Sequence, residues 1–194
     1  MRTNLHHLLE QMAHQCSGSP AVTFRDVTVS YAELWRMTSL VAQGLQALGL
    51  ARDDRVGIYL DKRIETVAAI FGTSAAKGAF VPINHILKAP QVGYILRDCD
   101  VRVLVTSHDR LELLREELNS CNFLEHVVLV DGHGELLADG KAYQVHAWSD
   151  LVAERSDSVA PQELAAVDLD MAAILYTSGS TGKPKGVVLS HRNL

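Results

Sequence analysis

The chain has 194 residues, 47% of them hydrophobic and 21% charged, a composition typical of a globular domain with a sizeable core. Its net charge of −5 comes from both signs scattered along the sequence, which argues against the clustered Lys and Arg of a nucleic-acid-binding protein. No stretch reaches the roughly 18 apolar residues of a membrane span, the first residues lack the apolar core of a signal peptide, and the three cysteines are widely spaced. We therefore expect a cytoplasmic protein.

The N-terminal quarter contains clear helix and strand patterns. The elements predicted here are a helix over 4–16, strands over 21–24 and 27–30, and a second helix that starts after Ser30. Ser30 and Glu33 form a capping box, in which the hydroxyl and the carboxylate bond free amides at the start of that helix. Gly49 is predicted to end the helix in the left-handed conformation.

Between residues 50 and 131, short apolar strands rich in β-branched residues alternate with helices. The predicted strands are 56–60, 80–83, 101–105 and 127–130, and the predicted helices are 64–77, closed by Gly78, a helix from Pro90 to Asp98, and 109–119. Strands of this kind are apolar on both faces because helices cover both faces of a parallel sheet. The sequence therefore predicts an α/β fold with a doubly wound, mostly parallel sheet flanked by helices.

The periodicity weakens after Asp131, where glycines indicate turns. The acidic stretch 153–168, rich in small residues, is predicted to be a surface connection. An apolar strand over 171–176 then enters the glycine-rich segment 176–186, with the sequence YTSGSTGKPKG, and a further strand is predicted over 187–190.

Segment 176–186 has the composition of a phosphate-binding loop. Its glycines let backbone N–H groups approach phosphate oxygens closely. Side-chain hydroxyl donors come from Thr177, Ser178, Ser180 and Thr181. Lys183 and Lys185 add positive charge, and Pro184 fixes the backbone between them. We expect Lys185 to face the phosphates and Lys183 to face solvent.

Other loop types fit this segment less well. A Walker A motif needs Gly where this chain has Thr177, and Ser or Thr where it has Pro184. The dinucleotide fingerprint GxGxxG is absent, and the nearest match to a hydrolase GxSxG motif, residues 178–182, lacks the first glycine. A flexible surface loop remains the structural alternative, but a strand leading into Gly, hydroxyl residues and Lys-Pro-Lys-Gly favours phosphate binding.

Segment 176–186 resembles, residue for residue, the signature loop of the adenylate-forming superfamily, which comprises acyl-CoA synthetases, luciferases and nonribosomal-peptide adenylation domains. Residues 29–34 (VSYAEL) and 76–84 (AKGAFVPIN) resemble two upstream landmarks of that superfamily. Residues 189–194 (LSHRNL) fit the helix start that usually follows the loop. The resemblance covers nearly the whole chain.

The resemblance implies a two-step reaction. A small-molecule carboxylic acid attacks the α-phosphate of ATP to give an acyl-adenylate and pyrophosphate, and a thiol of coenzyme A or of a carrier protein then displaces AMP. Mg²⁺ would bridge the β- and γ-phosphates. The implied ATP-binding residues are Thr177, Ser178, Gly179, Ser180, Thr181, Gly182 and Lys185. Lys185 would be the catalytic residue that stabilises phosphate charge, and acyl-CoA ligase is the expected subtype.

Members of this superfamily are normally much longer, so residues 1–194 are expected to form the N-terminal part of the large domain, ending just after the loop. We expect the isolated chain to be inactive. With a sheet edge left open, we also expect it to be marginally stable or aggregation-prone.

One alternative to an adenylate-forming enzyme is a non-catalytic remnant that binds nucleotide or pyrophosphate weakly or contacts a partner. Another is an unrelated phosphotransferase, but no metal ligand and base occur at convincing spacing.

Several other residues suggest sites that we do not predict. Nine histidines invite a metal site, but no set has recognisable ligand spacing, so we expect them at the surface or its rim. Acidic residues at strand entrances are predicted to be solvated turn formers. Cys99 is predicted to be buried and inert, and Trp35 to be half-buried in packing.

Overall fold

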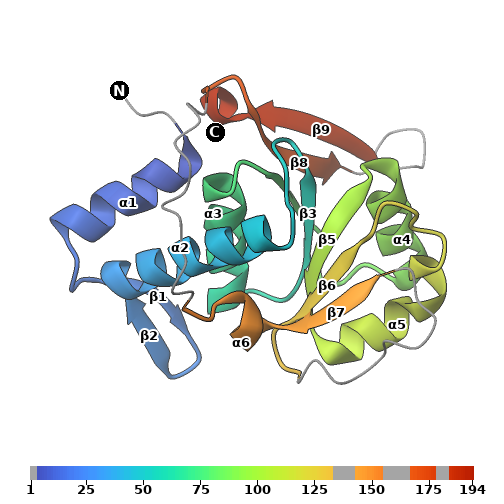
Figure 1. Cartoon of the computed structure of the whole chain (residues 1–194), viewed down its shortest axis with the longest axis horizontal. Helices are drawn as coiled ribbons and strands as arrows, with labels where there is room; N and C mark the ends of the chain where they lie inside the picture. Colours follow the sequence, from blue (N-terminus) through green and yellow to red (C-terminus); the bar gives the residue numbers. More distant parts are fainter. Residues whose placement is uncertain (1–3, 133–142, 155–166, 178–183) are drawn as a thin grey trace.

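A seven-stranded sheet forms the middle layer of the computed structural model, which describes residues 4–132, 143–154, 167–177 and 184–194 (Figure 1). Its strands are β3 (Arg55–Tyr59), β4 (Ala79–Pro82), β5 (Val101–Thr106), β6 (His126–Leu129), β7 (Gln144–Ala147), β8 (Met171–Thr177) and β9 (Lys185–Ser190). Their spatial order is β7-β6-β5-β3-β4-β8-β9, and all neighbours are parallel except the antiparallel pair β8–β9. The predicted mostly parallel sheet is confirmed.

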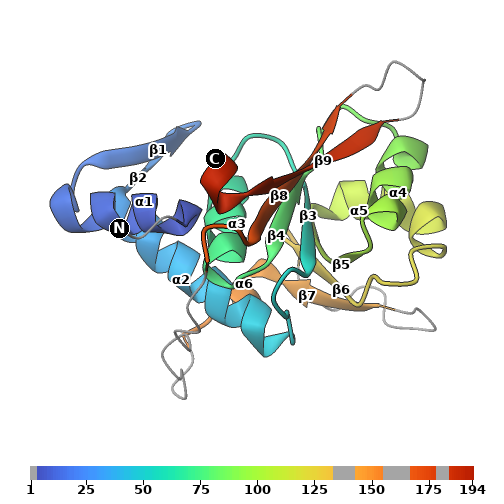
Figure 2. The same cartoon turned by 90° about the horizontal axis from the view of Figure 1, so that it is seen from above.

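Helices cover both faces of this sheet. They are α1 (Leu5–Gln15), α2 (Tyr31–Ala47), α3 (Ile64–Ala75), α4 (Ala89–Asp98), α5 (His108–Leu118), α6 (Trp148–Leu151) and the 3₁₀ turn η1 (His191–Asn193). Figures 1 and 2 show α1, α2 and α3 on one side of the sheet and α4 and α5 on the other. A separate antiparallel hairpin joins β1 (Pro20–Phe24) to β2 (Val27–Ser30). The predicted doubly wound arrangement is therefore confirmed.

Alternate strand residues supply two buried cores. Val56 and Val103 belong to the core that includes Leu45 of α2, whereas Leu104 belongs to the core that includes Leu111 of α5. Trp35 packs, partly buried, against the first of these cores, as predicted. In the described part of the chain, no helix has the length and apolarity needed to cross a membrane.

Local signals set the boundaries of α2 as predicted. The Glu33 N–H donates to Ser30 Oγ at 3.3 Å, and the Ser30 N–H donates to Glu33 Oε2 at 2.7 Å, which completes the capping box. At the other end, Gly49 has a φ of 82°, the left-handed conformation expected of a helix-terminating glycine.

Left-handed residues also precede the three central strands. They are Asp53 before β3, Lys77 before β4 and Asp100 before β5, with φ values of 64°, 68° and 48°. Lys77, one position before Gly78, takes the left-handed conformation at the end of α3, and the Gly78 N–H closes the helix by donating to the Thr73 carbonyl at 3.0 Å. Gly78 also allows close packing, since a Cβ there would lie 2.9 Å from Leu50 Cδ2.

β7 and α6 were not predicted from the sequence. β7 is a four-residue edge strand of mixed polarity, and α6 is a single helical turn, so neither has a detectable hydrophobic period. Tertiary packing holds α6 in place, since a Cβ on Gly44 of α2 would lie 2.3 Å from the Leu151 carbonyl oxygen. The predicted connection over 153–168 falls mostly on residues 155–166, which lie outside the described part of the chain.

Candidate phosphate site

The predicted phosphate loop joins β8 to β9. The two strands are antiparallel, with Tyr176 opposite Gly186 and Thr177 opposite Lys185. Because β8 is parallel to β4, the loop leaves from the carboxyl end of the parallel strands, where ligands bind in open α/β sheets. A strand rather than a helix follows the loop, which agrees with the rejection of a Walker A motif.

Thr177 and Lys185 are the two predicted site residues that the structure describes. The other five are Ser178, Gly179, Ser180, Thr181 and Gly182, and with Lys183 they lie outside the described residues. Directly opposed residues of an antiparallel pair project to the same face, so the Thr177 hydroxyl and the Lys185 ammonium lie on one side of the hairpin, at the mouth of the loop. Lys185 is exposed, and its side chain has no hydrogen bond or ion pair with the described residues. A hydroxyl and an uncommitted ammonium suit an anionic ligand.

Tyr176 anchors the hairpin on the opposite face. Its hydroxyl donates to Asp98 Oδ2 at 2.6 Å, at the end of α4. Burial, followed by the hydrogen bond with Asp98, raises the pKa of this hydroxyl. A Cβ on Gly186 would lie 2.9 Å from Ile174 Cγ2 and 3.2 Å from Tyr176 Cζ, so the ring occupies space that only glycine leaves open.

A second tyrosine contacts the segment that leaves the loop. The Tyr94 hydroxyl of α4 donates to the Pro184 carbonyl at 3.3 Å. Both ends of the loop are therefore tied to α4, one through Tyr176 and one through Tyr94. The sequence did not reveal these contacts, because Tyr94 and Pro184 are 90 positions apart and Tyr176 and Asp98 are 78 apart.

Cys99 lies behind this anchor and is buried, as predicted. Its S–H donates to the Ile95 carbonyl at 3.1 Å. Burial raises the pKa of the Cys99 thiol to about 11, and this outweighs the lowering effect of a hydrogen bond with Tyr176. A thiol with such a pKa is almost wholly protonated at neutral pH and is a poor nucleophile.

The histidines and the acidic residues at strand entrances only partly follow the predictions. The described residues contain no group of three or more side chains that could hold a metal ion. His191 is buried rather than at the surface, because its ring packs at the start of α1 and its Nδ1 accepts the Leu5 N–H at 3.2 Å. The prediction that acidic residues at strand entrances are solvated is wrong for Asp54 and Asp170, whose side chains are only 20% and 11% exposed because each pairs with an arginine.

These features define a doubly wound α/β protein with a glycine-, hydroxyl- and lysine-containing loop at the carboxyl end of its sheet, an arrangement typical of nucleotide-binding proteins. The family model described as AMP-binding enzyme matches residues 9–194. The chain therefore belongs to the AMP-binding enzyme family, and the resemblance to adenylate-forming enzymes is confirmed.

Individual relatives agree with this assignment. Gramicidin S synthase 2 of Aneurinibacillus migulanus is 32% identical over 187 residues, covering 96% of this chain and 4% of that protein. Bacitracin synthase 1 of Bacillus licheniformis is 32% identical over 187 residues, covering 96% of this chain and 3% of that protein. A solved anthranilate CoA ligase in complex with anthranoyl-AMP matches with a TM-score of 0.82 at 28% identity, covering 97% of this chain and 35% of that one. The chain thus spans only a minor part of each relative.

Proposed function

We propose that this chain binds the β- and γ-phosphates of ATP during the formation of an acyl-adenylate from a carboxylic acid. The observation that carries the proposal is the pairing of Thr177 with Lys185 at the mouth of the loop. This register directs a hydroxyl and an ammonium to one side, where Ser178, Gly179, Ser180, Thr181 and Gly182 would add donors. Membership of the AMP-binding enzyme family supplies the reaction class.

In the proposed reaction, a carboxylate oxygen of the acid bonds to the α-phosphorus of ATP, and the bond from that phosphorus to the α,β-bridging oxygen breaks to release pyrophosphate. Negative charge builds up on the departing pyrophosphate, and Lys185 would stabilise it while the hydroxyls and amides orient it. Mg²⁺ would enter with the nucleotide and neutralise phosphate charge. Among the described residues, no three or more His, Cys, Asp or Glu side chains form a group that could hold a metal ion.

The second step would transfer the acyl group to a thiol and release AMP. The sequence favoured coenzyme A as the acceptor, and a CoA ligase is among the similar structures. Two large synthases are among the similar curated proteins, which supports a carrier-protein thiol equally well. We propose a thiol acceptor of one of these two kinds, with cytoplasmic localisation retained as a prediction.

Binding of MgATP and of pyrophosphate to this chain, measured by calorimetry or ³¹P NMR, tests the phosphate-binding role. Lys185→Met should weaken both by tenfold or more, because hydrogen bonds to charged groups contribute about 1.5–3 kcal/mol. Lys62→Met is the matched control, since Lys62 is also exposed but precedes α3 and not the loop. Equal affinities for the Lys185 variant and the unchanged chain would refute the proposed role of Lys185.

An ATP–pyrophosphate exchange assay with a panel of carboxylic acids tests the expectation that this chain is inactive alone. We expect phosphate binding without exchange, because the chain spans 35% of the matched ligase and the rest of the site would come from other segments. Robust exchange by this chain would contradict that expectation. Absence of both exchange and phosphate binding would favour a non-catalytic remnant that only contacts a partner.

A further inference from the structure

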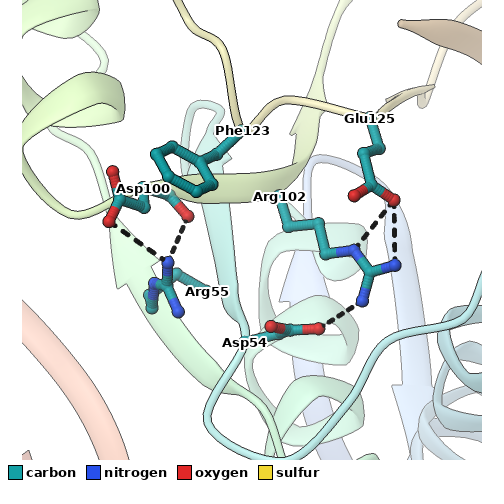
Figure 3. Close-up of a pocket in the computed structure, with 6 residues that line it drawn as sticks. All are labelled: Asp54, Arg55, Asp100, Arg102, Phe123 and Glu125. Carbon is teal, nitrogen blue, oxygen red and sulfur yellow. Dashed lines mark hydrogen bonds and ion pairs between the residues drawn. The ribbon is translucent and has the colours of Figure 1, made fainter.

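A pocket of about 200 Å³ opens at the amino ends of β3 and β5, on the opposite edge of the sheet from the phosphate loop. Its lining residues are Asp54, Arg55, Asp100, Arg102, Phe123 and Glu125. Figure 3 shows two groups of charged side chains that face each other across the pocket, one around Arg55 and one around Arg102. The Phe123 ring lies beside the Arg55 group. None of these residues takes part in the proposed phosphate binding by the loop.

The Arg55 guanidinium donates hydrogen bonds within the protein. Its Nε donates to the Cys99 carbonyl at 2.6 Å, its Nη2 to the Asp100 carbonyl at 2.7 Å, and its Nη1 to the Asp53 carbonyl at 3.3 Å. These bonds tie β3 to the turn before β5. They use three of the five N–H donors of Arg55.

The Arg102 guanidinium also donates hydrogen bonds within the protein. Its Nη1 donates to the Gly49 carbonyl at 2.7 Å and to Asp54 Oδ2 at 2.6 Å. Its Nε and Nη2 both contact Glu125 Oε2, each at 2.9 Å. Arg102 thus uses four of its five N–H donors, so most of the arginine donors around the pocket already bond the protein.

Acceptor capacity, by contrast, remains. Both arginine contacts to Glu125 fall on Oε2, which leaves Oε1 free of arginine, and the Glu125 side chain is 51% exposed. The Asp100 carboxylate is 45% exposed and lies 3.7 Å from Arg55 Nη2, too far for a strong hydrogen bond. Three carboxylates against two guanidiniums give the lining a net negative charge.

Phe123 adds an aromatic surface to these acceptors. It is 59% exposed, so the ring is accessible to a ligand at the pocket. The face of an aromatic ring carries negative potential and attracts a cation, and a guanidinium can stack flat on it. Carboxylate oxygens and an aromatic face together select an organic cation.

We propose that this pocket is a docking site for an arginine side chain of a partner polypeptide. The planar guanidinium can stack on Phe123 while donating to Asp100 and Glu125, which a compact ammonium cannot do equally well. The size agrees with one side chain, because sites for small organic ligands usually exceed about 300 Å³. The proposal is independent of the phosphate loop and would survive the failure of the proposed function.

The test is an NMR titration of the chain with the capped peptide acetyl-Gly-Arg-Gly-amide and with its citrulline counterpart, which has the same shape but no charge. We expect saturable shifts of the Phe123 signals with the arginine peptide, with affinity falling as salt rises, and no saturation with the citrulline peptide. Phe123→Ala should weaken binding by about two- to fivefold through loss of the cation–π contact. Asp100→Asn should weaken it similarly, and Asn tolerates the left-handed backbone at this position.

Two controls separate binding from folding. Leu113→Ala removes another exposed large apolar residue, 68% exposed on α5, and should leave peptide binding unchanged. Unfolding curves of the Phe123 and Asp100 variants should match that of the unchanged chain, because Phe123 is exposed and the Asp100 carboxylate has only a long contact with Arg55. Equal binding of the citrulline peptide, absence of saturation with either peptide, or undiminished binding by both variants would each overturn the proposal.

Discussion

The two ends of the parallel strands use their cationic side chains differently. At the amino ends, Arg55 donates to three backbone carbonyls, and Arg102 donates to one backbone carbonyl and two carboxylates, so most of their donors are used within the fold. At the carboxyl end, Lys185 is exposed and its side chain has no partner among the described residues. The same chemical property, positive charge, therefore stabilises the fold at one end and remains available to a ligand at the other.

This difference has an energetic consequence. A cation with protein partners contributes to the free energy of unfolding, whereas an exposed cation without partners contributes little until a ligand binds. The hairpin that carries Lys185 is held instead by two tyrosine hydroxyls, because Tyr176 donates to the Asp98 carboxylate and Tyr94 donates to the Pro184 carbonyl. Stability and ligand binding should therefore respond to separate substitutions at the two ends.

The largest expected effect tests this separation directly. Arg102→Met should lower the free energy of unfolding by about 3 kcal/mol, because it removes charged hydrogen bonds to two carboxylates and one carbonyl. It should leave MgATP affinity unchanged, whereas Lys185→Met should do the reverse. Urea unfolding and calorimetry measure the two quantities.

The control for this pair is Arg115→Met, which removes an exposed arginine whose partner, Glu112, lies on the same helix. Pairs of this kind contribute only about 0.2–1 kcal/mol. A tenfold loss of MgATP affinity in a folded Arg102→Met variant would show that the two ends are coupled. It would contradict the separation of stability at one end from ligand binding at the other.

The second prediction concerns the close approach at Gly186. Gly186→Val should lower the free energy of unfolding by about 1–3 kcal/mol, because the added carbons overlap Ile174 and the Tyr176 ring. It should also weaken MgATP binding, since displacing Tyr176 moves Thr177 at the mouth of the loop. Val187→Ala, at an exposed neighbour on the same strand, serves as the control. Unchanged binding by a folded Gly186→Val variant would show that the hairpin does not position the loop.

Local sequence signals and distant contacts were not equally predictable. The Ser30–Glu33 capping box, the Gly49 helix end and the loop itself depend on residues a few positions apart, and the structure confirms the first two. The alternation of apolar strands and helices was sufficient to predict the doubly wound sheet. Among the site residues, only Thr177 and Lys185 can be placed, and their pairing follows from a strand register that the sequence did not specify.

The missed features depend on tertiary structure. β7 has four residues of mixed polarity and forms because β6 offers it a parallel edge. His191 is buried because α1, 186 positions earlier in the chain, packs over it. Likewise, no local pattern shows that Tyr176 meets Asp98 or that Lys77 rather than Gly78 takes the left-handed conformation. These features follow only when the packing of whole elements is known.

The third prediction examines the tyrosine anchor at the carboxyl end. Tyr176→Phe should lower the free energy of unfolding by about 1 kcal/mol at neutral pH, because it removes the hydrogen bond to Asp98. The pKa of Tyr176 is raised in the folded protein, so its contribution is present below the ordinary value of 10.0 and is lost as the pH rises beyond it. Unfolding curves between pH 7 and pH 11 should therefore fall less steeply for Tyr176→Phe than for the unchanged chain, and an identical slope would contradict the anchor.

The smallest expected effect lies near the amino ends, where the His126 Nδ1 and His146 Nε2 atoms are 3.1 Å apart. Burial lowers the pKa of both imidazoles. Glu125 opposes this for His126 and Arg102 reinforces it, while for His146 the neighbouring His126 lowers the pKa and Asp150 raises it. Because the folded pKa values are depressed, the contribution of the neutral pair is present above the ordinary value of 6.5 and is lost as the pH falls below it.

The free energy of unfolding should consequently decrease between pH 7 and pH 5, by about 1 kcal/mol or less for this pair. His126→Asn keeps a hydrogen-bonding group near Nδ1 but does not titrate, so its unfolding free energy should fall less over this range. His85→Asn changes an exposed histidine after β4 and should retain the full decrease. If the two variants show the same dependence on pH, the acid sensitivity arises elsewhere, and the amino ends owe their stability to the arginine contacts alone.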